Sequence, residues 1–321
     1  MESFKLNLPN GAIVSGLHNI PPPSPSSSPK YRPLLVGLHG ASYSALYFDV
    51  DDTRTARLSS DGLGVPFVAI NRPCYEDSTP FYPIPDGSSF PEQFGLWLHK
   101  FILPALWAEY GSSQGCNSIV LDCHSLGATG AIIAAALHAQ DQDQDQDRGA
   151  GAYPLAGLIV SGFGTQPVEA EDHLTSSDVA ADRTSLELIE MPSAAKDAAM
   201  FAPGTVDEAV IAQGERLNRP VPSEEIRSLR KVWLPRWRAE WGARVRVPVM
   251  VAVAERDALW TGTEGHLRDF MGAFSGSERV DGSLVRGAPH CIELSWWSQG
   301  WYARCFGFAI ECAASFGVAG E

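Results

Sequence analysis

The sequence has no apolar run long enough to cross a membrane and no grouping of cysteine or histidine that would bind zinc. The longest apolar run extends from about Ala128 to Ala139, whereas a membrane-spanning helix needs about 20 residues. Six cysteines are scattered without a Cys-x-x-Cys pair, which argues against a zinc site and a disulfide framework. The first residues are neither basic nor strongly apolar, so we expect no secretory signal. These features predict reduced thiols, no bound metal, no membrane partner and a cytoplasmic location.

Basic residues and phosphate-binding motifs are also scarce. The chain has 24 Lys and Arg against 38 Asp and Glu, which gives a formal net charge of −14. Because an acidic surface repels phosphate backbones, we expect no nucleic-acid partner. The sequence contains no Gly-x-Gly-x-x-Gly fingerprint and no phosphate loop, so we expect no cofactor. Part of the negative charge lies in an alternating Asp-Gln tract at residues 141–147, whose composition predicts a disordered loop.

Apolar residues, in contrast, are plentiful enough for a packed core. Hydrophobic residues make up 45% of the 321 residues and aromatic residues 10%, which excludes disorder for most of the chain. The length suits one large domain with an insertion, or two modest domains. Near the start, residues 4–8 and 12–17 alternate with period two on either side of Asn10-Gly11, which predicts a hairpin. Residues 21–29 are rich in Pro and Ser and predict a solvated loop.

Short apolar runs without polar alternation predict strands that are buried on both faces of a parallel sheet. These runs are residues 34–38, 66–70, 118–122, 155–160 and 247–253. Helical candidates lie between them, at residues 91–110 and 125–140. The alternation of strand and helix implies right-handed crossovers, so we expect an α/β fold with a doubly wound, mostly parallel sheet.

A long segment, residues 165–245, separates two of the expected buried strands. Its helix-compatible stretches are residues 186–191, 206–217 and 224–241. An insertion of this size in a wound sheet is typical of a lid. We therefore predict a core in two parts, residues 1–164 and 246–321, with an inserted helical cap at residues 165–245.

Three tryptophans recur every four residues in this insertion, at Trp233, Trp237 and Trp241, so they follow one side of a helix. One interpretation is that they pack the insertion onto the core. The alternative is that Trp233 and Trp237 line an apolar substrate pocket. The aromatic and Met content of the insertion favours a medium-sized apolar or aromatic substrate.

The segment that points to chemistry joins the expected strand at 118–122 to the helix that follows. Residues 123–127 read Cys-His-Ser-Leu-Gly, so a serine with small neighbours lies between a strand and a helix. Such a turn forces the serine into strained backbone geometry, and large neighbours would collide with the adjoining elements. It presents Ser125 at the carboxyl edge of the sheet, beside the amide of Leu126. The neighbouring His124 is a candidate pocket residue, with packing against the sheet as the alternative.

This turn resembles the nucleophile elbow of the α/β-hydrolase superfamily, Gly-x-Ser-x-Gly, with Cys123 in place of the first glycine. Upstream, the expected strand at 34–38 runs into residues 39–42, His-Gly-Ala-Ser. In that superfamily a His-Gly turn places the next amide in the oxyanion hole, so the resemblance implies Ala41 and Leu126 as the two donors. We interpret His39 as a structural residue of the turn and Ser42 as a candidate pocket residue.

Two further residues complete the resemblance. The strand at 247–253 is followed by Glu255 and Asp257, and in the superfamily the triad carboxylate follows the penultimate strand. Asp257 matches this position best, with Glu255 as its competitor. A Gly-Ala-Pro-His loop then ends at His290, where the superfamily has its triad histidine. The order Ser, Asp, His matches this superfamily, and the resemblance covers essentially the whole chain.

The resemblance implies a serine hydrolase that cleaves an ester, lactone or thioester through an acyl-enzyme intermediate. Ser125 would be the nucleophile, His290 the base and Asp257 the group that orients it. Carbon–carbon bond hydrolases and hydroxynitrile lyases use the same triad, so these activities stay open. A receptor that keeps the scaffold without the chemistry is a further alternative. The expected partner is a small molecule, for example a secondary metabolite, and the sequence leaves the oligomeric state open.

Overall fold

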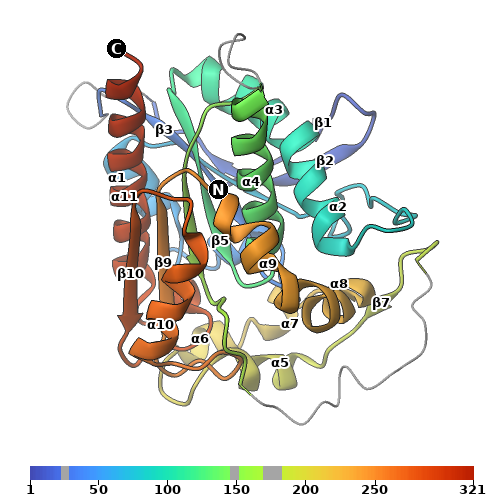
Figure 1. The fold of residues 1–321 in the computed structure, drawn as a ribbon. Coiled ribbons are helices and arrows are strands. Elements are labelled where there is room, and N and C mark those ends of the chain that lie inside the picture. The colour runs from blue at the N-terminus through green and yellow to red at the C-terminus, as the bar shows by residue number, and fades with distance from the viewer. Residues whose placement is uncertain (23–28, 145–151, 169–182) are drawn as a thin grey trace.

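The centre of the fold is a sheet in which eight strands pair within the described part of the chain (Figure 1). The computed structural model describes residues 1–22, 29–144, 152–168 and 183–321. The strands are β1 (Glu2–Asn7), β2 (Ile13–Asn19), β3 (Pro33–Leu38), β4 (Phe67–Ile70), β5 (Ser118–His124), β6 (Leu155–Ser161), β9 (Val249–Ala254) and β10 (Val280–Val285). Their order across the sheet is β1-β2-β4-β3-β5-β6-β9-β10. The pairings from β4 to β10 are parallel, whereas those of β2 with β1 and with β4 are antiparallel.

This arrangement confirms the predicted α/β class with a mostly parallel sheet. The five expected buried strands coincide with β3, β4, β5, β6 and β9, and all residues of these strands are buried. The expected hairpin is also present, because β1 and β2 pair on either side of Gly11, which has φ of +81°. A positive φ of this kind is what the Asn-Gly pair supplies to a tight turn.

Helices cover both faces of the sheet, which explains why its inner strands are mostly apolar (Figure 1). One face carries α2 (Phe90–Trp97), α3 (Leu103–Leu106) and α4 (Gly127–Gln144). The other face carries α1 (Arg57–Leu63) and the C-terminal α11 (Ser298–Ala319). Helix α10 (Glu264–Met271) packs against β9 and β10. The first and last turns of α3 continue into wider helical turns at Leu98–Ile102 and Trp107–Gly111, so residues 90–111 form one continuous helical segment.

The Asp-Gln tract begins inside a helix, which corrects the prediction of a loop for its first residues. Helix α4 extends through Gln144, and a carboxylate oxygen of Asp141 lies 3.0 Å from Nε2 of His99. This contact joins the end of α4 to the neighbouring helical segment. It could not be predicted from the composition of the tract. The remainder of the tract lies outside the described residues.

Between β6 and β9 lies a long segment with short elements of its own, which we call the insertion. Its described elements are β7 (Leu188–Ile189), α5 (Ser193–Met200), α6 (Glu208–Ile211), α7 (Gly214–Leu217), β8 (Val221–Pro222), α8 (Ser223–Ser228) and α9 (Leu234–Glu240). The expected helix at residues 186–191 is wrong, because Leu188 and Ile189 form strand β7 and pair with β8. A run of six residues that is followed by Pro192 is too short to form a stable helix without tertiary support.

The insertion lies across the carboxyl ends of the parallel strands (Figure 1). The amide of Arg219 in the insertion donates to the carbonyl of Ser42, in the loop after β3, over 3.1 Å. The amide of Cys291, in the loop after β10, donates to the carbonyl of Met200 over 3.3 Å. These contacts place the insertion over the edge at which strand β5 ends and Ser125 follows. Among the described residues, none of the helices combines the length and apolar composition that a membrane span requires.

Candidate active site

Ser125 lies in a strained turn between strand β5 and helix α4. Its φ is +49°, in the left-handed region that residues other than glycine rarely adopt, and its amide donates to the carbonyl of Ser161 over 2.9 Å. The turn needs a glycine at position 127, because a Cβ there would lie 2.4 Å from the carbonyl oxygen of Leu38. The geometry is therefore that of a strand-to-helix elbow, which holds the serine hydroxyl at the carboxyl edge of the sheet.

The loop after β3 approaches this serine closely. A Cβ on Gly40 would lie 2.9 Å from Cβ of Ser125, so only glycine fits at this position. The next residue, Ala41, and the residue after the serine, Leu126, are the two candidate oxyanion donors. No acceptor among the described residues takes a hydrogen bond from either backbone amide. Each amide therefore has an unused donor, as an oxyanion hole requires.

His39 shapes the loop after β3 and has no free ring nitrogen. The amide of Arg72 donates to its Nε2 over 3.1 Å, which leaves the proton on Nδ1, and Nδ1 donates to the carbonyl of Gly40 over 2.7 Å. Burial, together with the charge of Arg72, lowers the pKa of His39 well below its ordinary value. The ring is thus neutral and fully bonded, in keeping with its interpretation as a structural residue.

His290 and Asp257 lie together at the neighbouring strand ends. Nδ1 of His290 lies 2.8 Å from Oδ2 of Asp257, and the two side chains are each only 1% exposed. The second oxygen of Asp257 accepts hydrogen bonds from the amides of Leu259 and Trp260, over 2.8 and 3.2 Å. Nε2 of His290 is buried and has no hydrogen-bond partner among the described residues. The ring is thus oriented through one nitrogen and free at the other.

The competing carboxylate, Glu255, has different partners. It accepts a hydrogen bond from the guanidinium of Arg286 over 2.7 Å and from the amide of Gly287 over 2.8 Å. These bonds lower the pKa of Glu255, with Arg286 as the largest cause. Glu255 therefore ties down the turn that leads to His290, whereas Asp257 contacts the imidazole itself.

His124 lies behind the nucleophile and not in an open pocket. It is 1% exposed and donates from Nδ1 to the hydroxyl of Ser161 over 3.0 Å, and Ser161 donates to the buried carboxylate of Glu293 over 2.5 Å. Its ring stacks on Tyr47 with centroids 4.6 Å apart and meets His290 edge to face at 4.9 Å. This position favours packing over contact with a ligand. The ring contact links His290 to the residue that precedes Ser125.

The two candidate pocket tryptophans lie in the interface between the insertion and the core. Trp233 and Trp237 are 3% and 1% exposed, and their rings stack with centroids 5.8 Å apart. Trp237 also contacts Phe270 and Phe274, at 6.1 and 5.8 Å. These contacts favour the packing interpretation for Trp237. Trp233 differs, because its indole N–H is buried without an acceptor among the described residues.

Sequence reasoning missed a buried ion pair that ties the insertion to the core. Arg72, in the loop after β4, donates from its guanidinium to Glu225 in α8, and the hydroxyl of Tyr75 donates to the second carboxylate oxygen. The side chains of Arg72 and Glu225 are 0% and 3% exposed. The two residues are 153 positions apart, so no local pattern could have paired them.

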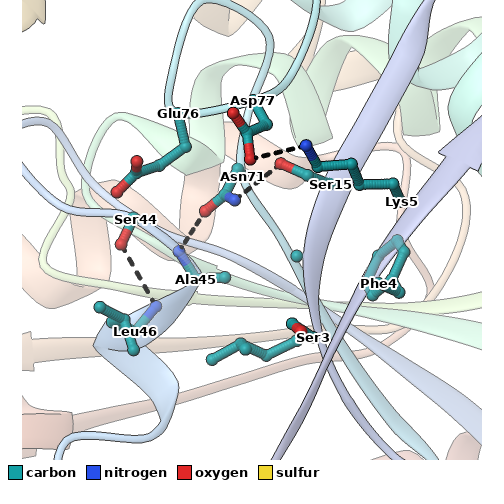
Figure 2. Close-up of a pocket in the computed structure, with 12 residues that line it drawn as sticks. Ser3, Phe4, Lys5, Ser15, Ser44, Ala45, Leu46, Asn71, Glu76 and Asp77 are labelled. Carbon is teal, nitrogen blue, oxygen red and sulfur yellow. Dashed lines mark hydrogen bonds and ion pairs between the residues drawn. The ribbon is translucent and has the colours of Figure 1, made fainter.

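A separate hollow of about 440 Å³ lies between the β1–β2 hairpin and the loops after β3 and β4 (Figure 2). Across it, Asn71 accepts a hydrogen bond from the amide of Ala45 and donates to Ser15, both over 2.8 Å. None of the candidate site residues is among those that line this hollow. It is therefore distinct from the Ser125 site.

Comparison with solved structures identifies the fold. The chain is similar to a monoacylglycerol lipase of Paleococcus ferrophilus, with a TM-score of 0.62 and 13% identity. The match covers 97% of this chain and 100% of the lipase. A thermophilic esterase of Thermogutta terrifontis matches over 98% and 99% of the two chains, with a TM-score of 0.58 and 14% identity. The thioesterase domain of the curacin biosynthetic pathway matches over 97% and 99%, with a TM-score of 0.55 and 15% identity. The chain thus has the α/β-hydrolase fold.

Sequence comparisons add no closer relative. No protein-family model matches the chain, and no curated protein matches its sequence. At 13 to 15% identity the structural matches show the fold, while the activity has to be argued from the site itself.

Proposed function

We propose that the protein is a serine hydrolase that cleaves an ester, lactone or thioester of a medium-sized, largely apolar small molecule. The observation that carries this proposal is the pairing of His290 with Asp257 at Nδ1, which leaves Nε2 without a partner among the described residues, in a chain whose Ser125 lies in a strained strand-to-helix turn. A serine hydroxyl is a weak nucleophile at neutral pH and needs an oriented base of this kind. The lipase, esterase and thioesterase with the same fold support the same class of reaction.

The first half-reaction forms an acyl-enzyme. Oγ of Ser125 attacks the acyl carbon while its proton passes to Nε2 of His290, and the carbonyl oxygen becomes an oxyanion. The amides of Ala41 and Leu126 would donate to this oxyanion, each worth about 3 kcal/mol in the transition state. When the tetrahedral intermediate collapses, the alcohol or thiol leaves with the proton from Nε2.

The second half-reaction restores the enzyme. Water gives its proton to Nε2 and attacks the acyl carbon, and the carboxylic acid leaves as Ser125 regains its proton. Asp257 keeps the ring in the Nδ1–H tautomer and stabilises the imidazolium in both steps. The chain's own residues therefore supply every proton transfer of the reaction.

We further propose that residues 165–245 act as a cap over this site, with residues 1–164 and 246–321 as the core. The hydrogen bonds of the insertion to the loops that carry Ser42 and Cys291 support this role. Ser125 is 8% exposed and His290 1%, so the reacting groups are almost closed off from water. A closed site strengthens the electrostatic interactions on which the oxyanion donors depend.

Labelling with a fluorophosphonate probe, followed by turnover of a panel of acyl esters and thioesters, tests the proposal. We expect labelling at Ser125 in the wild type and in Ser112→Ala, an exposed-serine control, and none in Ser125→Ala. Inertness to the probe together with tight ligand binding would favour a receptor. Labelling without turnover of any acyl substrate would favour a carbon–carbon bond hydrolase or a lyase.

A further inference from the structure

Lys196 is a buried cation in the insertion, close to the loop that approaches Ser125. It lies in α5 and is 0% exposed, and its Nζ lies 4.3 Å from the ring centroid of Tyr43. Among the described residues the ammonium group has one hydrogen bond, which is long, 3.5 Å to the carbonyl of Ser42. No carboxylate of the described residues forms an ion pair with it. Lys196 thus has more donors than the protein satisfies.

An ammonium group in this position is costly to the fold. A buried charge without a partner loses its hydration, and burial lowers the pKa of Lys196 to about 8. Near neutral pH the group therefore still carries its proton for most of the time. Its contacts, one long hydrogen bond to the Ser42 carbonyl and the ring face of Tyr43, leave two of its three N–H donors without an acceptor among the described residues.

The loop that Lys196 contacts also holds a donor without an acceptor. The hydroxyl of Ser42 is buried and has no hydrogen-bond partner among the described residues. Ser42 has φ of +60°, a strained value for a residue other than glycine. It follows Gly40 by two residues, and Gly40 touches Ser125. A partly satisfied ammonium and an unsatisfied hydroxyl therefore lie close together, against and within the loop that borders the nucleophile.

We propose that Lys196 and Ser42 form a subsite for a carboxylate group of the substrate, so that the enzyme acts on esters that carry a negative charge at one end. The proposal rests on the serine hydrolase function and narrows its substrate class. A carboxylate accepts from an ammonium and a hydroxyl at once, and such charge-assisted bonds are about twice as strong as neutral ones. The rest of the substrate remains apolar, as the aromatic content of the insertion suggests.

Matched pairs of esters test this subsite, because each pair has one shape and differs only in charge. Monoethyl glutarate and ethyl 5-methylhexanoate differ on the acyl side of the ester bond. The 4-(butyryloxy)butanoate ion and 4-methylpentyl butyrate differ on the alcohol side. We expect the wild type to favour the charged member of at least one pair by about tenfold or more in kcat/KM, near 1.4 kcal/mol. Equal rates within both pairs would overturn the proposal.

The variant Lys196→Met keeps the length of the side chain and removes its charge. We expect the preference for the charged ester to disappear, while kcat/KM for the neutral ester changes by less than about threefold, near 0.6 kcal/mol. Lys100→Met, at an exposed lysine of the helical segment after α2, should keep the preference. An equal loss on both esters of a pair would show that Lys196 only supports the fold. Lys196→Gln serves as a second variant if the Met side chain prevents folding.

Labelling of Ser125 separates this proposal from the proposed function. If the fluorophosphonate labels Ser125 and the charged and neutral esters of each pair are cleaved equally fast, the hydrolase function is supported and the carboxylate subsite is excluded. If Ser125 is not labelled and no ester is cleaved, the serine hydrolase function is excluded, and the carboxylate subsite that rests on it is excluded as well. Slower labelling of the wild type, but not of Lys196→Met, in the presence of free glutarate would support the subsite independently of turnover.

Discussion

The imidazole of His290 donates from Nδ1 to Oδ2 of Asp257 over 2.8 Å, with both side chains buried. An ionised carboxylate can only accept, so this bond places the ring proton on Nδ1 and leaves the lone pair of Nε2 free. Two backbone amides, those of Leu259 and Trp260, hold the other oxygen of Asp257 in place. The direction of the imidazole is therefore set by the loop after β9, not by contacts with Ser125.

Replacement of the orienting acid should impair catalysis without unfolding the protein. Asp257→Asn can donate a hydrogen bond to Nδ1 and so favours the wrong tautomer of His290, for which we expect a loss of turnover of about 10⁴-fold. Glu255→Gln is the matched control, because Glu255 contacts Arg286 and not His290. Steady-state rates of both variants on one ester provide the measurement. A larger loss in the control would place the triad acid at residue 255.

The nucleophile can be removed with little structural change. Ser125→Ala deletes only a hydroxyl from the elbow, so we expect acyl transfer to fall by about 10³-fold or more with an unchanged melting temperature. Turnover and thermal unfolding are measured on the same preparation. Turnover close to that of the wild type would exclude the serine mechanism.

Much of the core and the candidate site could be predicted because their signals are local. Buried strands are short and mostly apolar, and the turn at Ser125 is confined to five residues between such a strand and a helix. The choice between Glu255 and Asp257 was less local, since both follow β9 by a few residues. Geometry distinguishes them, because Glu255 is engaged by Arg286 and Gly287.

The parts that could not be predicted depend on contacts between distant segments. Nothing in the sequence around Lys196 or Arg72 distinguishes these cations from exposed ones, since their burial results from how the insertion lies on the core. The orientation of His124 depends on Glu293, far along the chain. Strand β7 likewise exists through its pairing with β8.

Trp237 should contribute to stability more than to substrate choice. It is 1% exposed and packs on Trp233, Phe270 and Phe274, so Trp237→Ala should lower the free energy of unfolding by about 3 to 5 kcal/mol. We expect the relative preference among acyl esters of different size to stay the same. Trp296→Ala, at a tryptophan that is 57% exposed, is the control and should change stability much less. A selective loss of activity on large acyl groups would instead show that Trp237 lines the pocket.

Asp122 should make the fold less stable as the pH rises. It lies in β5, and no N–H or O–H group among the described residues donates to its carboxylate oxygens. Burial raises the pKa of Asp122 well above its ordinary value, so the folded state keeps a proton that the unfolded state has lost. Stability therefore falls with increasing pH between the unfolded and folded pKa, by about 1.4 kcal/mol for each pH unit.

The variant Asp122→Asn does not titrate, so it should gain stability relative to the wild type as the pH rises. Urea unfolding at about pH 5 and about pH 7.5 measures this difference in the free energy of unfolding. The control is Asp143→Asn, at an exposed position of helix α4, which follows β5. Its stability relative to the wild type should change much less between the two pH values. A constant difference between Asp122→Asn and the wild type would mean that Asp122 is ionised in the folded protein.

The ion pair of Arg72 and Glu225 should stabilise the contact between the insertion and the core mainly because either charge alone would be buried without a counter-charge. Glu225→Gln leaves a buried guanidinium without its counter-charge, so we expect a loss of about 3 to 5 kcal/mol in the free energy of unfolding. The double variant Arg72→Met/Glu225→Met removes both charges and retains apolar volume. Because Nε and Nη2 of Arg72 already lack partners among the described residues, the double variant should recover most of the loss. Chemical unfolding of the two variants provides the comparison. If the double variant is as unstable as the single one, the hydrogen bonds of this pair stabilise the fold in their own right, and the insertion depends on the attraction between the charges.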